Sequence, residues 1–208
     1  MKTTMNTDEK TEMKNKTALE RLPGDIIGVI CDFLDITERN NLLKSSKALM
    51  IEQMQFRYLN LTKEYSLRFH EDEVFRETIN SLVVYPHRQI SLNLSYTSVL
   101  DVSALGNVHT LDLSCTDVND ASALRNVHTL DLSYTSVNDV SALGNVHTLI
   151  LCYTPVHDVR ALGSVHTLDL EGTTVVDVGA LGKVHTLILS SAYVEDVSAL
   201  GNVRIYWV

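Results

Sequence analysis

A repeat of 19 residues fills the second half of the chain. It is plainest in a histidine that recurs at this spacing, at His109, His128, His147, His166 and His185. A unit of this length is too short for two packed helices and a return turn, so each unit is predicted to be one coil made of a short strand and a tight return. Stacking such coils places their strands side by side in parallel.

Alternating polarity indicates where the strand lies within each unit. Leu111 and Leu113 alternate with Thr110, Asp112 and Ser114, which is the period-2 pattern of a strand with one buried face. The leucines are therefore predicted to point into the stack and to pack against the next coil.

The repeat resembles a known family. Written in register, it reads V-H-T-L-x-L-S-x-T-x-V-x-D-V-S-A-L-G-N, and over residues 90–208 this is similar to the leucine-rich repeat, LxxLxLxxNxL. The resemblance implies an α/β leucine-rich-repeat solenoid of stacked parallel strands with short return turns. Threonine stands where the family has an asparagine that bonds the backbone of the turn. The same role is expected of Thr97, Thr116, Thr135, Thr154 and Thr173.

Two other columns of the repeat carry titratable side chains. One aspartate per unit precedes the return segment: Asp101, Asp120, Asp139, Asp158, Asp177 and Asp196. These aspartates are expected to cap a helical turn, with ligand binding as the alternative. We interpret the histidine column as a product of repeat duplication, because no cysteine or carboxylate completes a coordination set beside it. No metal site and no cofactor are predicted.

The outward strand positions form the candidate working surface. Small hydroxyls, tyrosines, carboxylates and two exposed isoleucines on that face suit a protein partner. The residues predicted to bind a target are Asp112, Asp131, Tyr134, Ile150, Tyr153, Asp169, Glu171 and Ile188. The alternative is a solvated face with no specific ligand.

Residues 19–57 have a different pattern. Ile26, Ile27, Ile30 and Leu34 follow Pro23 at helical spacing, and proline suits a first helical turn. A second short amphipathic stretch follows. The pattern predicts a small helical module, and a helical bundle with no partner is one interpretation of it.

The string LPxDIIxxIxxFL followed by LLxxSSKxL resembles an F-box. The resemblance implies docking on a small linker protein that holds the chain to the cullin scaffold of a ubiquitin ligase. Residues implied in linker binding are Leu22, Pro23, Ile26, Ile27, Ile30, Leu34, Leu42, Leu43 and Leu49. An F-box joined to plain, recently duplicated leucine-rich repeats is similar to proteins that large DNA viruses and some protists carry in multiple copies.

The remaining segments complete the expected domain organisation. Residues 1–18 are expected to form a disordered tail. Residues 58–89 are expected to form a longer first repeat, because Tyr58–Thr62 echoes the repeat strand and Phe75, Ile79, Leu82 and Val83 share one helical face. This helix-bearing unit would cap the repeats of residues 90–208.

Charge and cysteine usage limit the possible partners and compartments. Residues 90–208 carry 12 acidic and 4 basic side chains, which accounts for −8 of the net charge of −9, so nucleic acid is not an expected partner. No stretch is apolar enough for a membrane span or a secretion signal. Cys31, Cys115 and Cys152 form no CxxC pair, and we interpret them as free thiols. A cytoplasmic or nuclear location, without secretion, is expected.

No motif of an enzyme is present. The chain has no glycine-rich phosphate loop, no GxSxG and no HExxH. The two modules together predict an adaptor that brings a target protein to a ubiquitin ligase. The alternatives are a stand-alone repeat module and a decoy that occupies the host linker protein without delivering a substrate.

Overall fold

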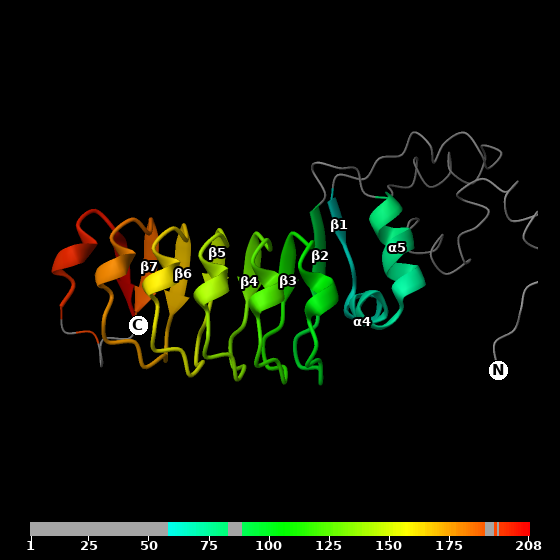
Figure 1. Cartoon of the computed structure of the whole chain (residues 1–208), viewed down its shortest axis with the longest axis horizontal. Helices are drawn as coiled ribbons and strands as arrows, with labels where there is room; N and C mark the ends of the chain where they lie inside the picture. Colours follow the sequence, from blue (N-terminus) through cyan, green and yellow to red (C-terminus); the bar gives the residue numbers. More distant parts are fainter. Residues whose placement is uncertain (1–57, 83–88, 190–193, 195) are drawn as a thin grey trace, which may run out of the picture. The chain divides into compact units, whose positions relative to one another are not determined.

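The computed structural model describes residues 58–82, 89–189, 194 and 196–208. The predicted helical module at 19–57, all of its candidate linker-binding residues and Cys31 lie outside these described residues. Element labels follow Figure 1.

One parallel sheet runs through the described residues, and its eight strands follow one another in sequence order (Figure 1). The strands are β1 (Tyr58–Asn60), β2 (Gln89–Asn93), β3 (Thr110–Asp112), β4 (Thr129–Asp131), β5 (Thr148–Ile150), β6 (Thr167–Leu170), β7 (Thr186–Leu189) and β8 (Arg204–Trp207). Between β3 and β7 the register joins equivalent residues of successive units, such as Leu111 to Leu130 and Leu130 to Leu149. The 19-residue period therefore sets the ladder, and the predicted leucine-rich-repeat solenoid is confirmed for the repeats.

The core is a set of stacked aliphatic columns. Leu130, Leu132, Val137 and Leu143 belong to one coil, and each has no exposed surface. The first two come from the strand, and the others come from the return side. The predicted strand parity is confirmed for the leucines, because each coil buries them against the coils on both sides.

Each return segment is one turn of 3-10 helix. These turns are η2 (Ser103–Leu105), η3 (Ser122–Leu124), η4 (Ser141–Leu143), η5 (Arg160–Leu162), η6 (Gly179–Leu181) and η7 (Ser198–Leu200). The coils pack closely here: a Cβ added to Gly144 would lie 2.4 Å from the carbonyl oxygen of Ala161 in the next coil. Glycine at this position permits the short distance between neighbouring backbones.

The aspartate and threonine columns both satisfy backbone groups. The Oδ1 of Asp139 accepts a hydrogen bond from the backbone N–H of Ser141 at 2.9 Å. The same bond recurs at the other five aspartates. Each aspartate lies one residue before the N-cap of its 3-10 turn and bonds the first N–H of the turn in an Asx turn, so it does not cap from the N-cap position as expected. The hydroxyl of Thr135 donates to the carbonyl of Leu132 at 2.7 Å, and the other four threonines do likewise.

Among the described coils, the one that begins at β1 carries α-helices. Helix α4 spans Lys63–Glu71 and α5 spans Glu73–Leu82. The buried Phe75 and Ile79 lie on the helical face expected from their spacing. Asp72 separates the helices and accepts the Phe75 N–H at 3.0 Å. Helix α4 is an addition to the sequence expectation, because its polar composition hides the buried Phe69.

Within the described part of the chain, no helix has the length and apolar character needed to cross a bilayer.

Candidate binding face

The strand face is the surface formed by the outward strand residues and by the residues two and three positions after the central outward residue of each strand. Its central column contains Asn93, Asp112, Asp131, Ile150, Asp169 and Ile188. The adjoining column contains Ser95, Ser114, Ser133, Cys152 and Glu171, and the rim contains Tyr96, Cys115, Tyr134, Tyr153 and Gly172. Every predicted target-binding residue lies on this face.

Hydrogen bonds hold the central carboxylates in place. Oδ1 of Asp131 accepts bonds from both the backbone N–H and the hydroxyl of Ser133, at 2.8 and 2.6 Å. Asp112 and Ser114 repeat this pair of bonds. Ser133 and Ser95 are buried, whereas Ser114, which makes the same bonds to Asp112, is half-buried. The serine column is therefore only partly exposed.

The isoleucines of the central column also differ from expectation. Ile150 and Ile188 are half-buried rather than exposed. Ile150 pairs with Asp131 on one side and Asp169 on the other. An aspartate at position 150 would stand next to both carboxylates and repel them. Isoleucine at this position avoids that repulsion.

The rim column has an unusual backbone conformation. Tyr96, Cys115, Tyr134 and Tyr153 have φ between 55° and 57°, and Gly172 has φ of 65°. This left-handed conformation turns the chain after each strand and lets each of the four N–H groups bond the next coil, as Tyr134 does with the Cys152 carbonyl at 2.9 Å. Residues other than glycine adopt it only at a cost of about 1–2 kcal/mol each.

The rim tyrosines form an exposed aromatic row. The rings of Tyr134 and Tyr153 stack with centroids 4.8 Å apart and an angle of 11° between their planes. The Tyr153 hydroxyl donates to Glu171 at 2.9 Å. A Cβ on Gly172 would lie 2.4 Å from the Tyr153 ring, so glycine in that coil leaves room for the ring. Tyr96, Tyr134 and Tyr153 have exposed fractions of 75%, 57% and 49%.

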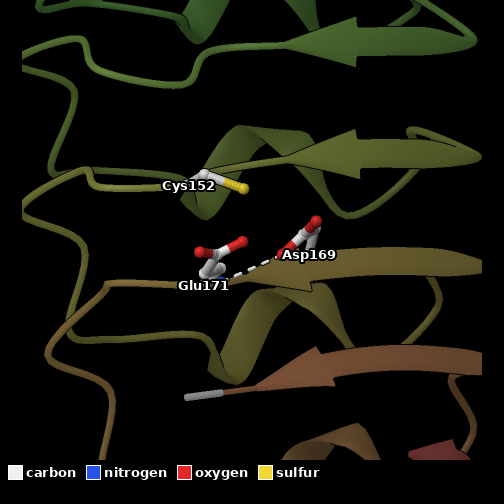
Figure 2. A group of neighbouring side chains, drawn as sticks. All are labelled: Cys152, Asp169 and Glu171. Carbon is white, nitrogen blue, oxygen red and sulfur yellow. Dashed lines mark hydrogen bonds between the residues drawn. The ribbon is translucent and has the colours of Figure 1, made fainter. Parts of the chain in front are cut away.

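The strand face also contains the one cluster of potential metal ligands found among the described residues. Figure 2 shows Cys152 facing Asp169 and Glu171 of the next coil, and the three ligand atoms lie within 4.8 Å of one another. Asp169 accepts the Glu171 N–H, and Glu171 accepts the Tyr153 hydroxyl, so the carboxylates have protein partners. Burial, with the nearby Asp169 charge, raises the pKa of Cys152 to about 12. A cation would need to displace that proton before the sulfur could bind it, and we assign no metal here.

This pKa predicts that Cys152 is unreactive. Its thiolate fraction near neutral pH is roughly a thousandfold below that of an ordinary cysteine. Alkylation of Cys152 by iodoacetamide, followed by mass spectrometry of its peptide, is therefore expected to be at least about a hundredfold slower in the folded protein than in urea. Asp169→Asn should increase the folded-state rate by removing a neighbouring negative charge. Equal rates in the folded and unfolded protein would contradict this account.

The histidine column lies on the strand side just before each strand. Its five imidazoles form one stack with 4.5 Å between successive centroids. Each Nδ1 lies 3.0–3.3 Å from the hydroxyl of the following threonine. Desolvation lowers the pKa of His109, His128 and His147 below the ordinary value of 6.5, and for the last two a neighbouring imidazole adds to the effect.

The stack predicts a loss of stability in mild acid. Because the folded-state pKa values lie below 6.5, the unfolded chain binds more protons as pH falls through this range. The stabilising contribution is complete above pH 6.5 and decreases below it. The melting temperature should therefore fall as the pH drops below about 6.5, and less steeply in His128→Gln/His147→Gln. Asp120 and Asp139 titrate at lower pH, because backbone N–H groups hold their pKa below 3.8. An identical slope in both proteins would contradict the prediction.

The repeat, the register and the coil geometry define the described repeats as a solenoid of parallel strands and 3-10 turns. No protein-family model matches the chain, and neither does any curated protein.

Solved structures similar to it include internalin C2 of Listeria monocytogenes, with a TM-score of 0.48 and 24% identity over 59% of this chain. Internalin InlF of L. monocytogenes gives a TM-score of 0.46 and 18% identity over 69% of this chain. The functional domain of InlJ of L. monocytogenes gives 0.46 and 18% over 60%. The chain spans 62%, 53% and 31% of these three chains, respectively.

Proposed function

We propose that this protein is a non-enzymatic adaptor whose strand face binds a target protein. The observation that carries the proposal is the composition of the face: exposed tyrosines stand beside fixed carboxylates, and none of its three columns contains lysine or arginine. Tyrosine is enriched in protein interfaces because it combines apolar area with a hydrogen-bonding group. A face of this kind suits a protein better than a small molecule, which needs a concave and mostly apolar pocket.

The second half of the proposal concerns residues 19–57. Their similarity to an F-box supports docking on the linker protein of a cullin ubiquitin ligase. Leu22, Pro23 and Ile30 would then contribute to an apolar interface. In this arrangement the amino-terminal module joins the ligase, and the strand face presents the target for ubiquitination.

Ile30→Asp tests the docking half. A carboxylate placed in an apolar interface without a partner costs several kcal/mol, so the full-length variant should lose binding to the purified linker protein in a titration. Asp131→Asn, a strand-face variant, is the matched control and should bind the linker as wild type does.

Three other outcomes would change the assignment. Equal linker binding by Ile30→Asp and wild type would show that the F-box interpretation is wrong. Failure of the wild-type protein to bind the linker at micromolar concentration would leave a stand-alone interaction module. Linker binding without ubiquitination of a bound protein would identify a decoy.

A further inference from the structure

We infer that the strand face recognises an extended, arginine-containing segment of its partner, with tyrosine and aspartate side chains of neighbouring coils holding the same guanidinium groups. This inference rests on the proposed function, since it specifies the chemistry of the partner that the strand face would bind.

The charged side chains in the three columns of the strand face are all acidic, whereas Lys63 lies beside the rim and Arg204 lies on the outward side of β8. Asp112, Asp131, Asp169 and Glu171 supply four carboxylates. Among the described residues, the ion pairs are Arg68–Asp72 and Arg160–Asp158, and neither involves these four groups. Carboxylates that are fixed by hydrogen bonds but lack a counter-charge favour a cationic partner.

The spacing of the carboxylates suits an extended chain. Asp112 and Asp169 are three coils apart, about 14 Å at roughly 4.8 Å per coil. Alternate side chains of an extended segment repeat every 6.6–6.8 Å or so, so that residues i and i+4 are separated by about 13–14 Å. A five-residue segment laid across the coils can therefore present three side chains along the acidic column.

The rim tyrosines point to a role at the surface. Left-handed backbone favours glycine, yet three of the five described rim positions carry tyrosine with φ near 55°. These rings are exposed and add little to the core. A strained backbone residue with an exposed side chain indicates a function for that side chain.

The tyrosine row of the rim is interrupted at Cys115. Cys115 lies between Tyr96 and Tyr134, which are two coils apart, about 9.6 Å. One face of the Tyr134 ring is covered by Tyr153, and in the described residues no ring stacks on the other. A planar guanidinium can stack on an aromatic face while its N–H groups pair with a carboxylate. Asp112 lies in the same coil as Cys115, three residues earlier in the chain.

The protein already provides one example of a cation beside the rim. The Nζ of Lys63 lies 5.8 Å from the centroid of the Tyr96 ring. Hydrogen bonding to Cys115, together with the nearby Tyr134 and Asp112, raises the pKa of Tyr96. Tyr96, Tyr134 and Asp112 therefore act on one small region, and arginine suits it better than lysine because its planar fork can stack and pair at the same time.

The test uses the full-length protein and fluorescein-labelled peptides. Fluorescence anisotropy at about 0.15 M salt would compare Arg-Ser-Arg-Ser-Arg with Lys-Ser-Lys-Ser-Lys and Glu-Ser-Glu-Ser-Glu. The arginine peptide should bind most tightly, the lysine peptide at least about threefold more weakly, and the glutamate peptide not at all.

Matched variants distinguish binding of the arginine peptide at the strand face from non-specific attraction to the net negative charge of the protein. Asp131→Asn/Tyr134→Ala should raise the Kd of the arginine peptide by about tenfold or more, whereas Tyr134→Phe keeps the ring and should bind nearly as wild type does. Asp120→Asn removes one charge from the return side, and its amide oxygen can still accept the Ser122 N–H. This control should change Kd by less than about twofold.

Three results would overturn the inference: no binding of the arginine peptide at about 1 mM, equal binding of the lysine peptide, or equal weakening in the Asp131 and Asp120 variants. A photo-crosslinker at position 134 distinguishes failure of the arginine inference from failure of the proposed function. If the crosslinker forms an adduct with a native protein although the arginine peptide does not bind, the strand face binds a protein of different chemistry.

Discussion

Leu130→Ala is expected to lower the free energy of unfolding by about 2–5 kcal/mol. Leu130 has no exposed surface and lies in register between Leu111 and Leu149. Truncation removes apolar contacts on both sides and leaves a cavity. The cavity cannot easily collapse, because strand ladders and 3-10 turns on both sides of the coil fix its distance from its neighbours.

Thr129→Ala is the matched control within the same strand. Thr129 is half-buried on the strand side, and its hydroxyl lies 3.2 Å from Nδ1 of His128. This contact is at the surface, so its loss should cost no more than about 1 kcal/mol. Urea unfolding followed by circular dichroism measures both variants. A larger effect for Thr129 than for Leu130 would contradict the strand parity and the position of the binding face.

Phe69→Ala is expected to cost about 3–5 kcal/mol in the coil that carries α4 and α5. Phe69 is 1% exposed and belongs to the helical layer that also buries Phe75 and Ile79. Arg76 crosses between the helices and donates to the carbonyls of Phe69 and His70, at 2.9 Å each. Losing the phenyl ring removes the largest apolar contribution of α4.

The effect of Phe69→Ala should remain local, because each coil of a solenoid contacts only its neighbours. Hydrogen exchange should accelerate for amides of β1 and α4, and much less for amides of β5 and β6. Val74→Ala, at a position 73% exposed in α5, should change neither. Equal acceleration across all strands would show instead that the described coils unfold as one cooperative unit.

The repeats could be predicted because their sequence, local structure and packing share one period. Leu111 and its equivalents specify both strand parity and register, since a slip of one residue would expose the whole column. The threonine and aspartate columns could also be predicted, because each satisfies backbone groups that every return turn leaves unpaired.

The details of the strand face depend on contacts between coils, which the pattern of a single unit does not contain. The orientation of the Ser133 hydroxyl follows from its bond to Asp131. The raised pKa of Cys152 follows from its burial and from the charge of Asp169 in the next coil. One signal of the left-handed rim was present in the sequence: Gly172 occupies a position that is tyrosine, cysteine or serine in the other repeats. Helix α4 was missed because its single deeply buried aromatic residue, Phe69, makes a weak periodic pattern.

Site-specific photo-crosslinking tests the central claim, that a protein partner binds the strand face, most directly. A benzoylphenylalanine would replace Tyr134 on the strand face or Ser141 on the return side, both of which are exposed, and each variant would be irradiated in its native cells. We predict a discrete protein adduct from position 134 that disappears with Asp131→Asn, and none from position 141. Adducts from position 141 alone, or from neither position, would contradict the claim.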